Sequence, residues 1–167
     1  CDRCTYARSS AIILYDFCKA LHIPVTVYGH STSGNSVELY SYAEFESIDN
    51  DDKYRMMDIA ASGSNHDGAA LRFVAEQLVK RPEEVKILIL VSDGQPAAPG
   101  YYGSAAEENL RGIKQEYRRT GVLFIAAAIG EDKQNIERYY GDSFMDIPNL
   151  HQLPVKLNDA ANRHQRV

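Results

Sequence analysis

Residues 86–94, KILILVSDG, carry the clearest signal of fold class in this chain. From Ile87 to Val91 every residue is apolar, without the alternation that marks a strand with one face in water. Such a run is typical of a parallel strand covered on both faces. Ser92 and then Asp93 follow where the run stops. The stretch therefore predicts a buried strand of an α/β sheet with a carboxylate at its carboxyl end.

The segments around this strand alternate between helical and extended patterns. Before it, apolar residues recur at i, i+3, i+4, i+7 and i+8 from Leu71 to Val79, which predicts an amphipathic helix ended by Pro82. After it come a helix from Ser104 and a second buried strand at 122–129. This order predicts right-handed crossovers in a doubly wound, mostly parallel sheet. The remaining predicted elements are a short helix at 133–140, a weak strand at 144–147 and a C-terminal helix.

The N-terminal part of the chain predicts a helix and an antiparallel hairpin. Apolar positions within residues 5–21 follow helical spacing. Residues 25–28 and 37–45 are rich in strand-forming side chains, and the loop between them is too short for a crossover helix. The two strands are therefore expected to pair at one edge of the sheet. Residues 46–62 are polar and predict a solvated loop.

Composition narrows the classes of function. The 167 residues predict a single domain over 1–167. A net charge of −5, without a basic block, argues against nucleic-acid binding. No apolar run approaches the roughly 20 residues that span a bilayer, and no signal peptide is recognisable. Three cysteines without a framework spacing indicate a reduced, cytoplasmic chain.

A second candidate acid lies in residues 63–70, GSNHDGAA. The two glycines have the spacing of a phosphate-binding loop, but Ala69 and Ala70 replace the lysine and hydroxyl that such a loop needs. The loop carries Asp67 instead, just before a predicted helix whose positive end points at it. Ligands of open α/β sheets bind at the carboxyl ends of the strands, so Asp67 and Asp93 can face one site.

Three chemistries compete for these acids. Nucleotide hydrolysis fails because the chain has no phosphate-binding lysine loop. Phosphoryl transfer through an aspartyl nucleophile favours two aspartates spaced D-x-D, and Val91 takes the place of the first. A divalent-cation site of carboxylates and hydroxyls from separate loops suits Mg²⁺ or Mn²⁺. A Mg²⁺-dependent phosphohydrolase centred on Asp93 remains the alternative to a binding module.

Two pairs of aromatic residues lie near the same predicted edge. His30 and His66 make a zinc site with the acids conceivable, but they lack ligand spacing and are interpreted as polar surface residues. Tyr101 and Tyr102 follow the strand in a loop rich in proline and glycine. They either pack this loop or contact a partner, since tyrosine is favoured at interface hot spots.

Together these motifs resemble the von Willebrand factor type A (VWA) domain, in the branch of cobaltochelatase-type subunits and nitric-oxide-reductase activators. The resemblance covers nearly the whole chain, through the helix ending YDFCKAL, the hairpin VTVYGHS…VELYSYAEF, the loop NHDGAAL and the strands LILVSDGQP and LFIAAAIG. It implies a non-enzymatic protein-binding module with a metal-ion-dependent adhesion site at the carboxyl ends of the strands. Asp67 would belong to the second ligand loop of that site and Asp93 to the third.

One feature of the family is absent from the sequence. The first ligand loop, D-x-S-x-S, is not found, and the chain begins on the family's first helix. The resemblance therefore implies an N-terminally truncated domain without its central first strand. Mg²⁺ or Mn²⁺ is then expected to bind this chain weakly or not at all. The strands ending at Tyr28 and Val91 would have unpaired edges, which leaves direct pairing, a strand swap or a dimer open.

The resemblance also indicates a class of partner. Family members bind a protein that presents a carboxylate to the bound ion. Relatives in this branch often work beside ring-forming ATPases of the MoxR type or in chelatase assemblies. A MoxR-type AAA+ ATPase is therefore a candidate partner, and neither nucleic acid nor a membrane is expected.

Overall fold

The computed structural model describes residues 2–46, 49–92, 96–128 and 133–146, with residues 155, 158, 159 and 162. Its elements are α1 (Asp2–Ala20), β1 (Val27–Ser33), β2 (Ser36–Ala43), α2 (Asp52–Met57), α3 (Asp67–Val79), β3 (Lys86–Ser92), α4 (Gly103–Arg118), β4 (Val122–Ala128), α5 (Lys133–Tyr140), the 3₁₀ turn η1 (Gly141–Ser143) and β5 (Phe144–Asp146). The predicted C-terminal helix falls mostly outside the described residues. None of the helices described combines the length and the apolar character needed to cross a bilayer.

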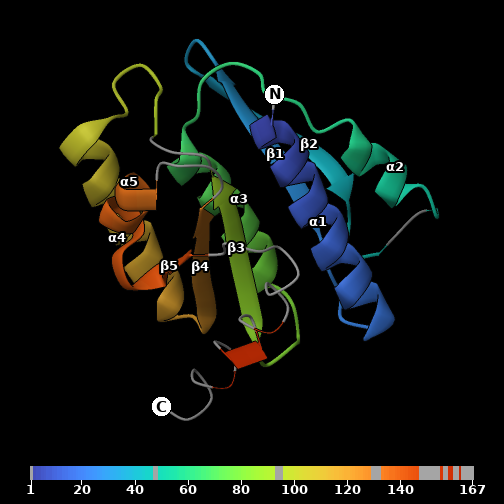
Figure 1. Ribbon diagram of the computed structural model, residues 1–167. Coiled ribbons are helices and arrows are strands. Elements are labelled where there is room, and N and C mark those ends of the chain that lie inside the picture. The colour runs from blue at the N-terminus through green and yellow to red at the C-terminus, as the bar shows by residue number, and fades with distance from the viewer. Residues whose placement is uncertain are drawn as a thin grey trace.

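The described strands form two separate sheets. β1 and β2 pair antiparallel as a hairpin, with Val27 opposite Ala43 and Ser33 opposite Ser36. β3, β4 and β5 form a parallel sheet in that order. Figure 1 shows the hairpin to one side of the parallel sheet. This arrangement confirms the predicted α/β class, the parallel sheet and the antiparallel hairpin.

Successive residues of β3 pack on opposite faces of the parallel sheet. Leu88 and Leu90 join the main hydrophobic core, which α3 and α4 cover. Ile87 and Ile89 are partly buried on the other face, where they pack in one cluster with Leu14 of α1. An apolar side chain is needed on both faces, which explains why the strand shows no polar alternation.

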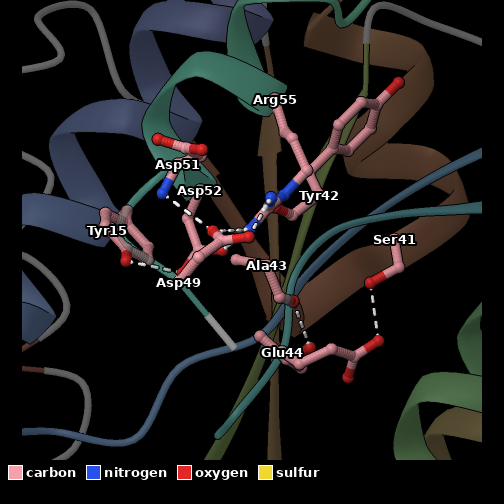
Figure 2. A network of polar contacts seen from close by, with 10 residues as sticks. Tyr15, Ser41, Tyr42, Ala43, Glu44, Asp49, Asp51, Asp52 and Arg55 are labelled. Atoms are coloured by element: carbon pink, nitrogen blue, oxygen red, sulfur yellow. Dashed lines mark hydrogen bonds and ion pairs between the residues drawn. The ribbon is translucent and has the colours of Figure 1, made fainter. Parts of the chain in front are cut away.

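The polar segment 46–62 contains a helix, so the prediction of a loop was wrong there. α2 packs against α1 and β2, where its buried Met56 clusters with Tyr15 and Ala43, and the side chain of Asp52 is only 1% exposed. The hydroxyl of Tyr15 donates to Asp52 Oδ2 at 2.7 Å, and Arg55 pairs with both Asp52 and Asp49 (Figure 2). These contacts join segments far apart in the chain, so no local pattern could reveal them.

Candidate cation site

The carboxyl ends of β1 and β3 meet at the loop that leads into α3. Thr32, near the end of β1, exchanges backbone hydrogen bonds of 2.8 and 3.1 Å with Ser64. Ala97, beyond the end of β3, donates to the backbone carbonyl of Asn65 at 3.1 Å and to its side-chain Oδ1 at 2.8 Å. β1 and β3 therefore end at one loop and run in the same direction (Figure 1).

Asp67 is the first residue of α3, one turn earlier than the helix was predicted to begin. Its side chain is 1% exposed, and the hydroxyl of Tyr140 donates to its Oδ2 at 2.9 Å. His30 Nε2 lies 3.6 Å from Asp67 Oδ1. The other ring nitrogen of His30, Nδ1, is buried without a hydrogen-bond partner among the described residues. The carboxylate thus lies between β1 and α5, at the positive end of α3.

The interpretation of His30 as a surface residue was wrong. Its side chain is 19% exposed and faces Asp67, which the sequence could not show because 37 residues separate the two. His66 lies on the other side of the loop, where its ring stacks on Tyr101 with the centroids 3.7 Å apart. Its Nδ1 accepts the Ala69 N–H at 3.4 Å and caps α3. Of the two histidines, His30 is therefore the one beside the candidate site.

Burial raises the pKa of Asp67, because the ionised carboxylate loses its water. His30, Tyr140 and the Asn65 side chain act in the opposite direction without cancelling the rise. A raised pKa means that the folded protein binds this proton more tightly than the unfolded chain does. In the absence of a cation, ionisation of Asp67 therefore lowers the free energy of unfolding.

Substitution of Asp67 by asparagine is expected to raise the unfolding temperature of the cation-free protein at pH 7. The wild-type free energy of unfolding should fall as pH rises from the ordinary aspartate pKa to the raised value, and the variant should lack this component. Thermal unfolding between pH 3 and pH 8 measures both. Asp16→Asn, at a side chain that is 50% exposed, is the control. A lower unfolding temperature for Asp67→Asn than for wild type at pH 7 would contradict the expectation.

Tyr101 and Tyr102 have different positions. Tyr101 is 5% exposed, and its hydroxyl accepts the Gly68 N–H and donates to Asn109 Oδ1, both at 3.1 Å. It therefore packs the loop and ties the start of α3 to α4, which leaves little of its surface for a partner. Tyr102 is 68% exposed and remains a candidate contact.

The prediction for Asp93 lies outside the described residues, because residues 93–95 are not among them. The last described residue before it is Ser92, at the buried carboxyl end of β3. Among the residues that the structure describes, no three His, Cys, Asp or Glu side chains cluster closely enough to hold a metal ion. Of the two acids predicted as metal ligands, Asp67 is therefore the one whose surroundings the structure describes.

A groove of about 1160 Å³ separates β1 from β3. Its lining is mainly apolar and includes Leu14 of α1, Val74 of α3 and Ile89 of β3, and His30 also faces it. The described parts of the hairpin and the parallel sheet share no strand pairing, so β1 and β3 each have an unpaired edge along the groove. The unpaired edges predicted from the sequence are thus present, and the two strands do not pair directly.

Comparisons with known proteins give one matching family and several relatives. The family described as the cobalamin biosynthesis protein CobT VWA domain matches residues 53–153. The uncharacterized protein YojO of Bacillus subtilis (strain 168) is 24% identical over 170 residues, which cover 93% of this chain and 26% of YojO. Protein NorD of Brucella suis biovar 1 (strain 1330) is 32% identical over 93 residues, 54% of this chain and 15% of NorD. The chain thus spans about a quarter of YojO and less of NorD.

A solved structure shares the fold. Proximal thread matrix protein 1 (PTMP1) from the mussel byssus superposes with a TM-score of 0.61 and 19% identity, over 96% of this chain and 42% of that one. A second structure of PTMP1 has zinc in a MIDAS motif. At this level of identity the likeness shows the fold alone.

Proposed function

The chain belongs to the family of CobT-type VWA domains, and on this basis we propose that residues 1–167 are one non-enzymatic protein-binding module with a divalent-cation site at the carboxyl ends of β1 and β3. The observation that carries the proposal is the position of Asp67. Its buried carboxylate stands at the start of α3, beside the loop where both strands end. Ligands of open α/β sheets bind at this edge.

The residues present fit such an ion in part. Asp67 supplies a hard oxygen ligand, which Mg²⁺ and Mn²⁺ prefer. Asp93, the residue after the end of β3, would supply a second carboxylate. The zinc found in the MIDAS motif of PTMP1 supports divalent-cation binding by this fold. The remaining oxygen ligands would be hydroxyl and carboxylate side chains from outside the described residues.

We propose that the segment carrying those ligands lies in the groove between β1 and β3. An extended segment lying there would satisfy two unpaired backbone edges and cover an apolar lining. Since β1 and β3 run in the same direction, a parallel segment would end beside Asp67. The segment would come from the same polypeptide or, by a strand swap, from a second copy. Sedimentation of the natural protein separates these two sources.

The proposed partner is a protein that presents a carboxylate to the bound ion. Because the chain resembles this branch, we propose a MoxR-type AAA+ ATPase or a chelatase assembly as the source of the partner. Tyr102, exposed in the loop after β3, is the proposed contact. The free thiols of Cys4 and Cys18 support a reducing, cytoplasmic location.

A calorimetric titration with Mg²⁺ and Mn²⁺ tests the cation site. Residues 1–167 alone are expected to bind weakly or not at all, because most of the oxygen ligands are absent. A chain that also carries a D-x-S-x-S loop is expected to bind with micromolar affinity. Either Asp67→Ala or Asp93→Ala should weaken that binding by about 100-fold, as loss of a direct ligand does at least as much harm as loss of its supporting contacts.

Asp16→Ala is the matched control, since this half-exposed aspartate of α1 pairs with Lys53 and lies outside the contacts described for Asp67. Absence of binding by the natural protein would reject the cation site. Turnover of a generic phosphate ester by the wild type, lost in Asp93→Asn, would instead support a phosphohydrolase.

A further inference from the structure

Tyr140 lies at the end of α5 and reaches the carboxylate oxygen of Asp67 that does not face His30. Its side chain is 2% exposed, and its hydroxyl donates to Asp67 Oδ2 at 2.9 Å. The two residues are 73 positions apart, so this bond depends entirely on the tertiary packing that brings the end of α5 to the start of α3. Both ends of the bond are buried, which shields it from competition by water.

The ring of Tyr140 is itself fixed. It stacks on Phe124 of β4, with the centroids 5.8 Å apart and the planes at 17°. Its backbone carbonyl accepts a hydrogen bond of 3.0 Å from Lys114 Nζ of α4. The hydroxyl therefore cannot leave Asp67 without disturbing the contacts of β4 and α4.

This bond gives the two carboxylate oxygens of Asp67 different roles. Oδ2 is occupied by the Tyr140 hydroxyl, whereas Oδ1 points to His30, a residue that lines the groove. A carboxylate rotates easily about its last side-chain bond, because that torsion is broad and roughly two-fold. A hydrogen bond to one oxygen restricts this rotation.

We propose that Tyr140 is a positioning residue of the cation site, which holds Asp67 by Oδ2 so that Oδ1, the oxygen on the His30 side, is the single-oxygen ligand. This inference rests on the proposed function. Partners of this kind orient metal ligands, and their loss commonly lowers metal affinity. A tyrosine hydroxyl has an ordinary pKa of about 10. The phenol therefore remains a donor at neutral pH.

The test is the Mg²⁺ affinity of Tyr140→Phe in the natural protein, measured by calorimetry at a temperature where all variants are folded. Phenylalanine keeps the stack on Phe124 and removes only the hydroxyl. Affinity is expected to fall about 10-fold, the lower end of the effect of such supporting contacts. In an Asp67→Asn background, the same substitution should change affinity no further.

Tyr139→Phe is the matched control. This neighbour on α5 is 7% exposed and has no hydrogen bond to Asp67 in the described structure. It should leave Mg²⁺ affinity unchanged. An unchanged affinity in Tyr140→Phe, with only a lower unfolding temperature, would show a purely structural role and overturn the inference. An equal loss in Tyr139→Phe would overturn it too, whereas a wild type that binds no Mg²⁺ would reject the proposed function itself and the inference with it.

Discussion

Substitution of Gly68 by alanine is expected to destabilise the protein, although alanine normally favours a helix. A Cβ at residue 68 would lie 2.1 Å from Asn109 Oδ1, 2.6 Å from the Tyr101 hydroxyl and 3.2 Å from Ile113 Cδ1. The first two distances are far below van der Waals contact. Tyr101 and Asn109 would have to move, and with them the hydrogen bond that holds the Gly68 N–H.

The substitution of Gly68 by alanine makes opposing contributions to the free energy of unfolding. Overpacking costs about 1–3 kcal/mol, and the disturbed hydrogen bonds add about 1 kcal/mol. The gain in helix propensity from glycine to alanine is at most about 1 kcal/mol. We therefore expect a net loss of about 2 kcal/mol, which corresponds to about 4–8 °C in unfolding temperature for a chain of this size.

Gly112→Ala provides a control with the opposite expected sign. Gly112 lies within α4, and a Cβ there would meet no atom within 4 Å. Alanine at this position should stabilise the protein by up to about 1 kcal/mol, by propensity alone. Chemical denaturation of both variants measures the two changes in the free energy of unfolding. Equal effects of the two substitutions would show that the crowding around Gly68 has no energetic consequence.

A second large loss of stability is expected for Asp52→Ala. Asp52 is 1% exposed, accepts the Tyr15 hydroxyl at 2.7 Å and pairs with Arg55. Its removal leaves a buried hydroxyl without this acceptor and weakens the contact between α1 and α2. The unpaired polar group alone costs about 1–3 kcal/mol, so we expect a loss of about 2–3 kcal/mol in the free energy of unfolding.

Asp49→Ala is the matched control for this network. Asp49 binds the same guanidinium group (Figure 2), but its side chain is 44% exposed. Exposed ion pairs contribute little, so the substitution should change stability only slightly. Tyr15→Phe should also cost less in the Asp52→Ala background than in the wild type, since the two residues share one hydrogen bond. Similar losses for Asp49→Ala and Asp52→Ala would contradict a special role for the buried acid.

The close packing around Gly68 also explains why α3 begins with an Asp-Gly pair. Asp67 provides the carboxylate, and the hydrogen on the next α-carbon lets Tyr101 and Asn109 approach the helix start closely. This approach orients the first turn of α3, from which Asp67 projects. A glycine read in the sequence as part of a loop is thus required by packing against α4.

The types of the main elements could be predicted from the sequence. The apolar run of β3, the similar run of β4 and the helical spacing within α3 depend on neighbouring residues alone. Asp67 was a candidate for the same reason, because an aspartate before an amphipathic helix is a local signal. The α2 helix was missed because its burial depends on Tyr15, 37 positions before Asp52.

Local sequence patterns therefore predict the order of the strands and of the helices other than α2, together with one carboxylate at the edge of the sheet. The tertiary structure decided that His30 and Tyr140 flank this carboxylate, that Tyr101 packs inside the loop, and that an apolar groove separates β1 from β3. The physical reason is the range of the interactions. Periodicity and turn chemistry act between neighbours in the chain, whereas the partners of Asp67 come from β1 and α5 and meet only when the chain is folded.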